Sequence, residues 1–213
     1  MVSNKKYILL LEALLCSLGF MAFAYFIHDQ FPKRIISFVG LMLPAYIMSR
    51  QCYSLSDLYK VFGILKISKK LLLFIIVGIM LGLIYAALYR NVLSIPIFPK
   101  TIRNFAAVAA LIGILEELVF RGFIQGHVRS INPYFSILFG TISHTAYKCC
   151  LFLSPVIEHK IDIQFLMIWT FIGGLVFGLL KEFSKSVIPS AIAHSSFDIL
   201  AYAECVVAPW WVW

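Results

Sequence analysis

The sequence is poor in charge. Only 13% of its 213 residues are charged, and only 10 are acidic, whereas about a quarter of the residues in a soluble domain carry charge. Hydrophobic residues make up 62% of the chain, and the mean hydropathy is +0.93. These values exclude an ordinary soluble globule, a disordered chain and a disulfide-stapled secreted module. They predict an all-α, polytopic membrane helix bundle that is integral to the membrane.

Several common catalytic and metal-binding motifs are also missing. The chain has no His-Glu-x-x-His zinc motif and no Gly-x-Ser-x-Gly nucleophile elbow. Its five cysteines form no metal-ligand pairs. The net charge of +8 comes from Lys and Arg scattered between apolar runs, which is typical of loops beside membrane spans and not of a nucleic-acid surface. We therefore expect lipid and no nucleic acid as a partner.

Apolar runs divide the chain into about seven candidate transmembrane helices, since a span needs about 20 apolar residues. The second run is short and contains Pro44. The first contains Glu12, which disfavours a cleaved signal peptide, so we expect it to stay as a span. The seven runs cover residues 7–27, 33–49, 71–90, 104–126, 133–153, 163–182 and 187–207.

The stretch 54–70 is the longest polar break, and its apolar residues recur at helical spacing between lysines. It is either an interfacial amphipathic helix or a plain loop. With seven spans, more Lys and Arg lie on the N-terminal side than on the other. The positive-inside rule then predicts a cytoplasmic N-terminus, in the cell membrane if the organism is a prokaryote. The terminal aromatics of residues 208–213 are expected to anchor at the interface.

The ionisable residues inside the spans carry the functional signal, because each costs roughly 2.5 to 3.5 kcal/mol at a helix centre. Adjacent glutamates on a helix diverge by about 100°, whereas residues four apart share a face. Glu117 can therefore neutralise Arg121, while Glu116 is free to point at a neighbouring span. We take Glu116 as the candidate general base and Glu117 with Arg121 as structural support.

Two further spans carry polar groups at compatible depth. His194 and Asp198 lie four apart in the seventh span, so they share one face. His144 lies near the middle of the fifth span, and Lys148, one turn later, is a candidate for steering anions. These groups could meet at one level of the bundle to form a polar site. Glycines in the sixth span, Gly173, Gly174 and Gly178, would allow close packing around it.

These motifs resemble the CAAX-prenyl-protease and bacteriocin-processing (CPBP, or Abi) family of intramembrane endopeptidases. The family pattern is Glu-Glu-x-x-x-Arg, Phe-x-x-x-His and His-x-x-x-Asn or Asp. Glu116 to Arg121 matches the first element and His194 to Asp198 the third. The second departs, because Gly140 stands four residues before His144 and Phe139 five before. The resemblance covers about residues 104–207.

The resemblance implies a four-helix catalytic core at 104–207, after N-terminal helices at 1–103 and before the tail at 208–213. By analogy, Glu116 and His144 activate water, while His194 and Asp198 stabilise the oxyanion. An ionised Asp cannot donate to an oxyanion, so Asp198 must be protonated or must hold His194 as the donor. The substrate would be a membrane-associated or prenylated protein, or a peptide.

Two questions stay open on sequence alone. Glu116, His144, His194 and Asp198 could bind Zn²⁺, or the site could be a metal-free glutamate protease without a cofactor, which the resemblance favours. The irregular second motif also fits a catalytically silent scaffold or immunity protein that binds a peptide in the same pocket. A small proton-coupled transporter is a weaker alternative, because the chain shows no repeated hydropathy pattern.

Overall fold

The computed structural model describes residues 2–64, 68–156 and 162–205, and all regular structure within them is helical. The predicted polytopic helical bundle is confirmed in its all-helical character. The aromatic tail at 208–213 lies outside the described residues. The helices are α1 (Val2–Phe26), α2 (Arg34–Ser49), α3 (Leu55–Val61), α4 (Lys69–Val92), α5 (Asn104–Glu117), η1 (Leu118–Ile124), α6 (Gln125–Val128), α7 (Pro133–Leu153), α8 (Ile163–Ser184) and α9 (Ile188–Ala201).

Each of the seven predicted spans corresponds to helix, with α5, η1 and α6 forming one continuous stretch. Three helical segments, Lys6–Phe26, Lys69–Val92 and Ile163–Ser184, are long and apolar enough to cross a membrane, and α2 is a shorter apolar helix. Large hydrophobic side chains along their outer faces are exposed, among them Leu73, Met80 and Ile84 on α4. Lipid suits such a surface and water does not. The protein is therefore integral to a membrane, while its orientation stays a prediction.

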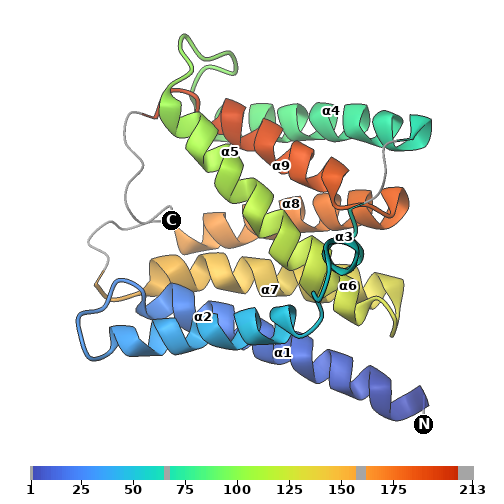
Figure 1. Ribbon diagram of the computed structural model, residues 1–213. Helices are drawn as coiled ribbons and strands as arrows, with labels where there is room; N and C mark the ends of the chain where they lie inside the picture. Colours follow the sequence, from blue (N-terminus) through green and yellow to red (C-terminus); the bar gives the residue numbers. More distant parts are fainter. Residues whose placement is uncertain (1, 65–67, 157–161, 206–213) are drawn as a thin grey trace.

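The helices pack in a simple spatial order (Figure 1). α2 packs on α1, α1 on α7, α7 on α8, and α9 lies between α4, α5 and α8. α5 runs obliquely across the bundle in Figure 1 and packs on α9. This crossing brings the end of α5 next to both α7 and α9, which carry the two predicted histidines.

Pro44 lies inside α2 and packs against a glycine of α1. A Cβ at Gly19 would lie 2.5 Å from the Gly40 carbonyl oxygen and 2.9 Å from Pro44 Cδ. The two helices thus touch through small residues, as is common in membrane bundles.

The N-terminal helices are also tied to the bundle by a buried polar contact. His127 Nε2 lies 3.0 Å from Glu12 Oε2 and 2.9 Å from Gln51 Nε2. Glu12, the unusual charge of the first span, therefore has a partner in α6. This contact links α1 to α6.

The polar break at 54–70 contains only a short helix. α3 starts at Ser54, whose side chain accepts a hydrogen bond from the Asp57 backbone N–H. The helix ends at Val61 and buries none of its side chains. Residues 65–67 lie outside the described part of the chain, so the longer amphipathic helix is not seen as such.

Candidate active site

The end of α5 places Glu116 against α7, as the sequence geometry predicted. His144 Nε2 lies 3.1 Å from Glu116 Oε2, and Lys148 Nζ lies 2.5 Å from Glu116 Oε1. Glu116 and His144 are both buried. The carboxylate is thus held between an imidazole and an ammonium group. Lys148, expected only to steer anions, is in fact the ion-pair partner of Glu116.

Glu117 points in a different direction and contacts two groups at once. Its Oε1 lies 3.4 Å from Arg121 Nη1, which is the predicted pairing, and 3.1 Å from His194 Nδ1. The second contact was not foreseen, because a pattern within one helix cannot show which neighbour packs on it. Glu117 therefore supports His194 as well as Arg121.

Arg121 extends this set of contacts to the other histidine. Its Nη1 lies 2.8 Å from His144 Nδ1. A guanidinium has only donors, so Nδ1 of His144 accepts, and the proton of the neutral ring lies on Nε2. That proton faces Glu116. A continuous chain thus runs from His144 through Arg121 and Glu117 to His194.

The seventh predicted span supplies His194 and Asp198 on one face of α9. Asp198 Oδ2 lies 3.7 Å from His194 Nε2, and Glu116 Oε2 lies 3.9 Å from the same nitrogen. Both separations exceed a direct hydrogen bond. His194 is therefore held through Nδ1 by Glu117, and its Nε2 stays open toward the two other carboxylates.

The helix changes its winding directly after the two glutamates. Residues Leu118–Ile124 form a π-helix, with α-helix on both sides. Short π-helical insertions in α-helices often accompany functional sites. The wider turn carries Arg121 to a position from which it reaches both Glu117 and His144. The local sequence pattern does not predict this feature.

The departure in the second motif has a packing explanation. A Cβ on Gly140 would lie 3.1 Å from the Phe120 carbonyl oxygen and 3.2 Å from Gln125 Cβ. α7 therefore packs directly against η1, and a large side chain at position 140 would separate them. Phe120 of η1 instead supplies an aromatic ring, whose centroid is 4.7 Å from that of His144. His144 consequently reaches Glu116 despite the changed spacing.

Small residues allow the helices to approach around these groups. A Cβ on Gly113 would overlap Asp198 Oδ2, and a Cβ on Gly174 would lie 2.7 Å from Thr141 Cγ2 and 3.1 Å from Arg121 Nη2. The expectation that α8 glycines permit close packing is thus confirmed. Gly113 does the same between α5 and α9.

A cavity of about 290 Å³ opens beside the polar groups. Glu116, Lys148, His194 and Asp198 lie at one part of its wall. The rest is mainly aromatic and aliphatic, with rings from α4, α8 and α9: Tyr85, Tyr89, Phe165, Trp169, Phe177 and Phe197. The cavity can hold an apolar group next to the carboxylate.

The site does not fit a resident metal ion well. Across residues 2–64, 68–156 and 162–205, no group of three or more His, Cys, Asp or Glu side chains is arranged to hold one. Lys148 already pairs with Glu116 as a cation. Water activation without a metal stays a prediction.

Comparison with known proteins agrees with the resemblance inferred from the motifs. No curated protein and no solved structure matches the chain. A family model described as type II CAAX prenyl endopeptidase Rce1-like matches residues 98–200, which include all six predicted site residues. Residues 98–200, just under half of the chain, are therefore similar to the type II CAAX prenyl endopeptidase Rce1-like family.

Proposed function

We propose that this chain is a metal-free intramembrane endopeptidase in which Glu116 is the general base. The single observation that carries the proposal is the position of Glu116: a buried carboxylate that faces His144, Lys148 and His194 at the wall of a cavity. Ionisable groups are costly inside a membrane, so their presence there usually marks a functional site. The family match supports the reaction class.

In this proposal Glu116 takes a proton from water while the water attacks the substrate carbonyl, and it gives this proton to the leaving amine when the C–N bond breaks. A carboxylate has about four acceptor positions, so its contacts with His144 and Lys148 leave room for a water. His144 acts as a donor, because Arg121 occupies its Nδ1 and its Nε2 proton faces Glu116. It holds the carboxylate in place and is not itself the base. This differs from the joint role that the family analogy gave it.

His194 is the proposed donor to the oxyanion. Glu117 holds its Nδ1, and its Nε2 faces the cavity between Glu116 and Asp198. When Nε2 carries a proton it can donate to the tetrahedral oxygen. Asp198 serves by stabilising the protonated ring, which resolves the difficulty that an ionised carboxylate cannot donate.

The substrate is proposed to be a membrane-associated protein or a peptide with an apolar group next to the cleaved bond. The aromatic part of the cavity suits a prenyl chain or a large apolar side chain. The polar part then meets the peptide bond. A silent scaffold would use the same surfaces for binding alone.

The test compares membrane-associated peptides by quantitative mass spectrometry in cells that carry the wild type, Glu116→Gln or Glu117→Gln. We expect a discrete precursor to accumulate with Glu116→Gln, with cleavage reduced at least about a hundredfold, because a general base contributes roughly 10² to 10⁴ in rate. Glu117→Gln should reduce cleavage less if the protein still folds.

Expression and monodispersity in detergent serve as controls for folding. If a folded Glu116→Gln variant processes every peptide as the wild type does, the protease proposal is wrong. Retained host phenotype with that variant would then favour the scaffold.

A further inference from the structure

A second cavity of about 420 Å³ lies away from the candidate active site, at the end of the bundle where α3 and α6 lie (Figure 1). Its wall contains Lys60, Arg129, Lys181 and Lys185, with Glu182 as the acidic residue among its lining residues in the described part of the chain. The proposed proteolysis uses none of these groups. The excess of positive charge requires an explanation.

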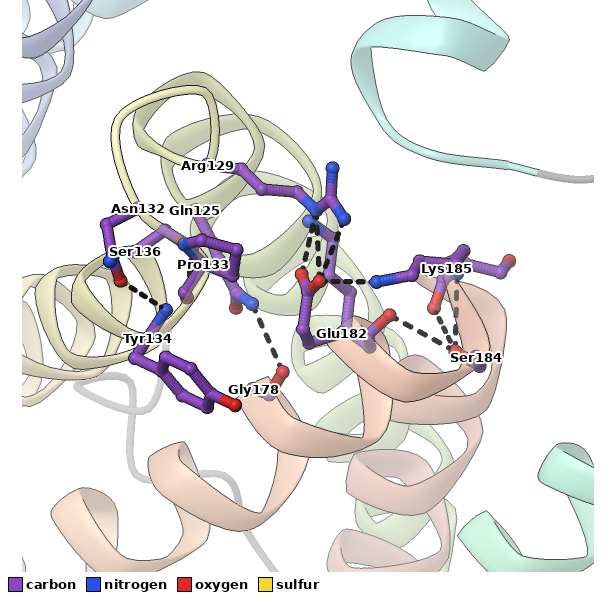
Figure 2. A network of polar contacts seen from close by, with 12 residues as sticks. Gln125, Arg129, Asn132, Pro133, Tyr134, Ser136, Gly178, Glu182, Ser184 and Lys185 are labelled. Carbon is purple, nitrogen blue, oxygen red and sulfur yellow. Dashed lines mark hydrogen bonds and ion pairs between the residues drawn. The ribbon is translucent and has the colours of Figure 1, made fainter.

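Glu182 is already compensated by two of these cations. Arg129 Nε and Nη2 donate to its carboxylate at 2.8 and 2.9 Å, and Lys185 Nζ lies 2.5 Å from Oε1 (Figure 2). Lys60 Nζ lies 3.8 Å from Asp57, at an exposed position. Glu182 carries one negative charge and pairs with two cations, so this group of three residues keeps a net positive charge.

Among the described residues that line this cavity, Lys181 is a buried cation that makes no direct ion pair with an acid, although Glu182 lies nearby. Its side chain is only 5% exposed, yet its ammonium has no hydrogen bond or ion pair with the described residues. A buried charge without a partner is strongly unfavourable. It lines the cavity together with Arg129 and Lys185, so an anion placed there would pair with it.

The depth of this cavity indicates the source of the anion. The candidate spans Lys6–Phe26 and Lys69–Val92 begin at this end of the bundle, and Ile163–Ser184 ends there. The level at which spans leave the hydrocarbon is the level of lipid phosphates. Leu9 and Val61 also line the cavity, so apolar atoms adjoin the cationic groups.

We propose that this cavity binds a phosphate group, supplied by the headgroup of an anionic phospholipid, through Lys181, Arg129 and Lys185. Basic pockets between helices at a membrane interface are a recognised binding mode for anionic headgroups. Arg129 keeps its ion pair with Glu182 while one oxygen of the phosphate pairs with Lys181. Glu182 faces the same space and limits the net charge that the cavity can accept.

The experiment uses the full chain, delipidated in detergent and titrated with phosphatidylglycerol or phosphatidylcholine, with bound lipid counted by native mass spectrometry. Inorganic phosphate and glycerol 3-phosphate form soluble arms, read by thermal unfolding. We expect phosphatidylglycerol to be retained over phosphatidylcholine. Lys181→Met should weaken that retention about fivefold, the usual contribution of one basic residue near a membrane surface.

Lys181→Arg should restore retention, and Lys69→Met, an exposed lysine at the same end of the bundle, is the matched control that should bind as the wild type. If Lys181→Met does not fold, Lys185→Met replaces it, with a smaller expected loss. Protection by the soluble phosphates alone would support the phosphate site and identify a soluble source. Equal retention of the two lipids with no effect of soluble phosphate, or unchanged retention in folded Lys181→Met, would overturn the proposal.

Discussion

Lys148 sets the charge balance around Glu116. The pair is largely buried, with side-chain exposures of 17% for Lys148 and 7% for Glu116. Removing one member of a buried ion pair leaves the other without compensation, which costs roughly 3 to 5 kcal/mol. The lysine therefore stabilises the resting site as well as the ionised base.

We expect Lys148→Met to destabilise the protein by about 3 kcal/mol or more and to abolish cleavage, because Glu116 then lacks its cation. Glu116→Gln introduced together with Lys148→Met should recover most of the stability but none of the activity. Thermal unfolding in detergent and a cleavage assay measure the two quantities. A double variant as unstable as Lys148→Met alone would show that the pair is not what stabilises this region.

The candidate active site forms where α5 packs against α9. Gly113 lies where α5 passes His194 and Asp198, and a Cβ there would meet Asp198 Oδ2 and lie 3.1 Å from His194 Cγ. Both contacts involve groups with proposed roles. A small change in helix separation therefore acts directly on the chemistry.

Gly113→Ala is expected to lower stability by about 1 to 3 kcal/mol, the usual effect of overpacking, and to reduce cleavage by displacing Asp198. Gly126→Ala is the matched control, because its nearest neighbour is 3.7 Å from the added Cβ. Thermal unfolding and cleavage rates compare the two variants. Equal behaviour of both would mean that α5 and α9 can separate without harm.

Helix periodicity was sufficient to predict the elements and the direction of each glutamate, since residues four apart share a face. It did not predict η1, because a π-helix depends on what the surrounding helices offer and not on a local pattern. It also did not predict that Glu117 would contact His194. That pairing depends on the crossing of α5 and α9, which no single segment encodes.

For the whole molecule, hydropathy placed each of the seven predicted spans on helix, although α9 ends at Ala201 and the predicted span ran on to 207. Two cations of the charge count that gave the orientation, Arg90 and Lys181, are buried. Arg90 Nη2 donates to Glu204 Oε2 at 2.8 Å, so it is a packing residue and not a free loop charge. The remaining cations of the count still favour a cytoplasmic N-terminus.

We predict that Ser130 and Lys100 lie on opposite sides of the membrane, since their connections lie at opposite ends of the bundle (Figure 1). In a background with the five cysteines replaced by serine, a membrane-impermeant maleimide should label Lys100→Cys in intact cells. Ser130→Cys should react only after permeabilisation. The reverse pattern would place the N-terminus outside.

The chain of contacts from His144 through Arg121 and Glu117 to His194 has a consequence for variation in this protein. The two histidines, on separate helices, are linked through the Arg121 guanidinium and the Glu117 carboxylate, which pair with each other. Their substitutions will therefore show strong epistasis: the effect of changing one position depends on the residue at the other three. A single change among these four residues will rarely be tolerated. Functional variants will instead change two or more of the four positions together.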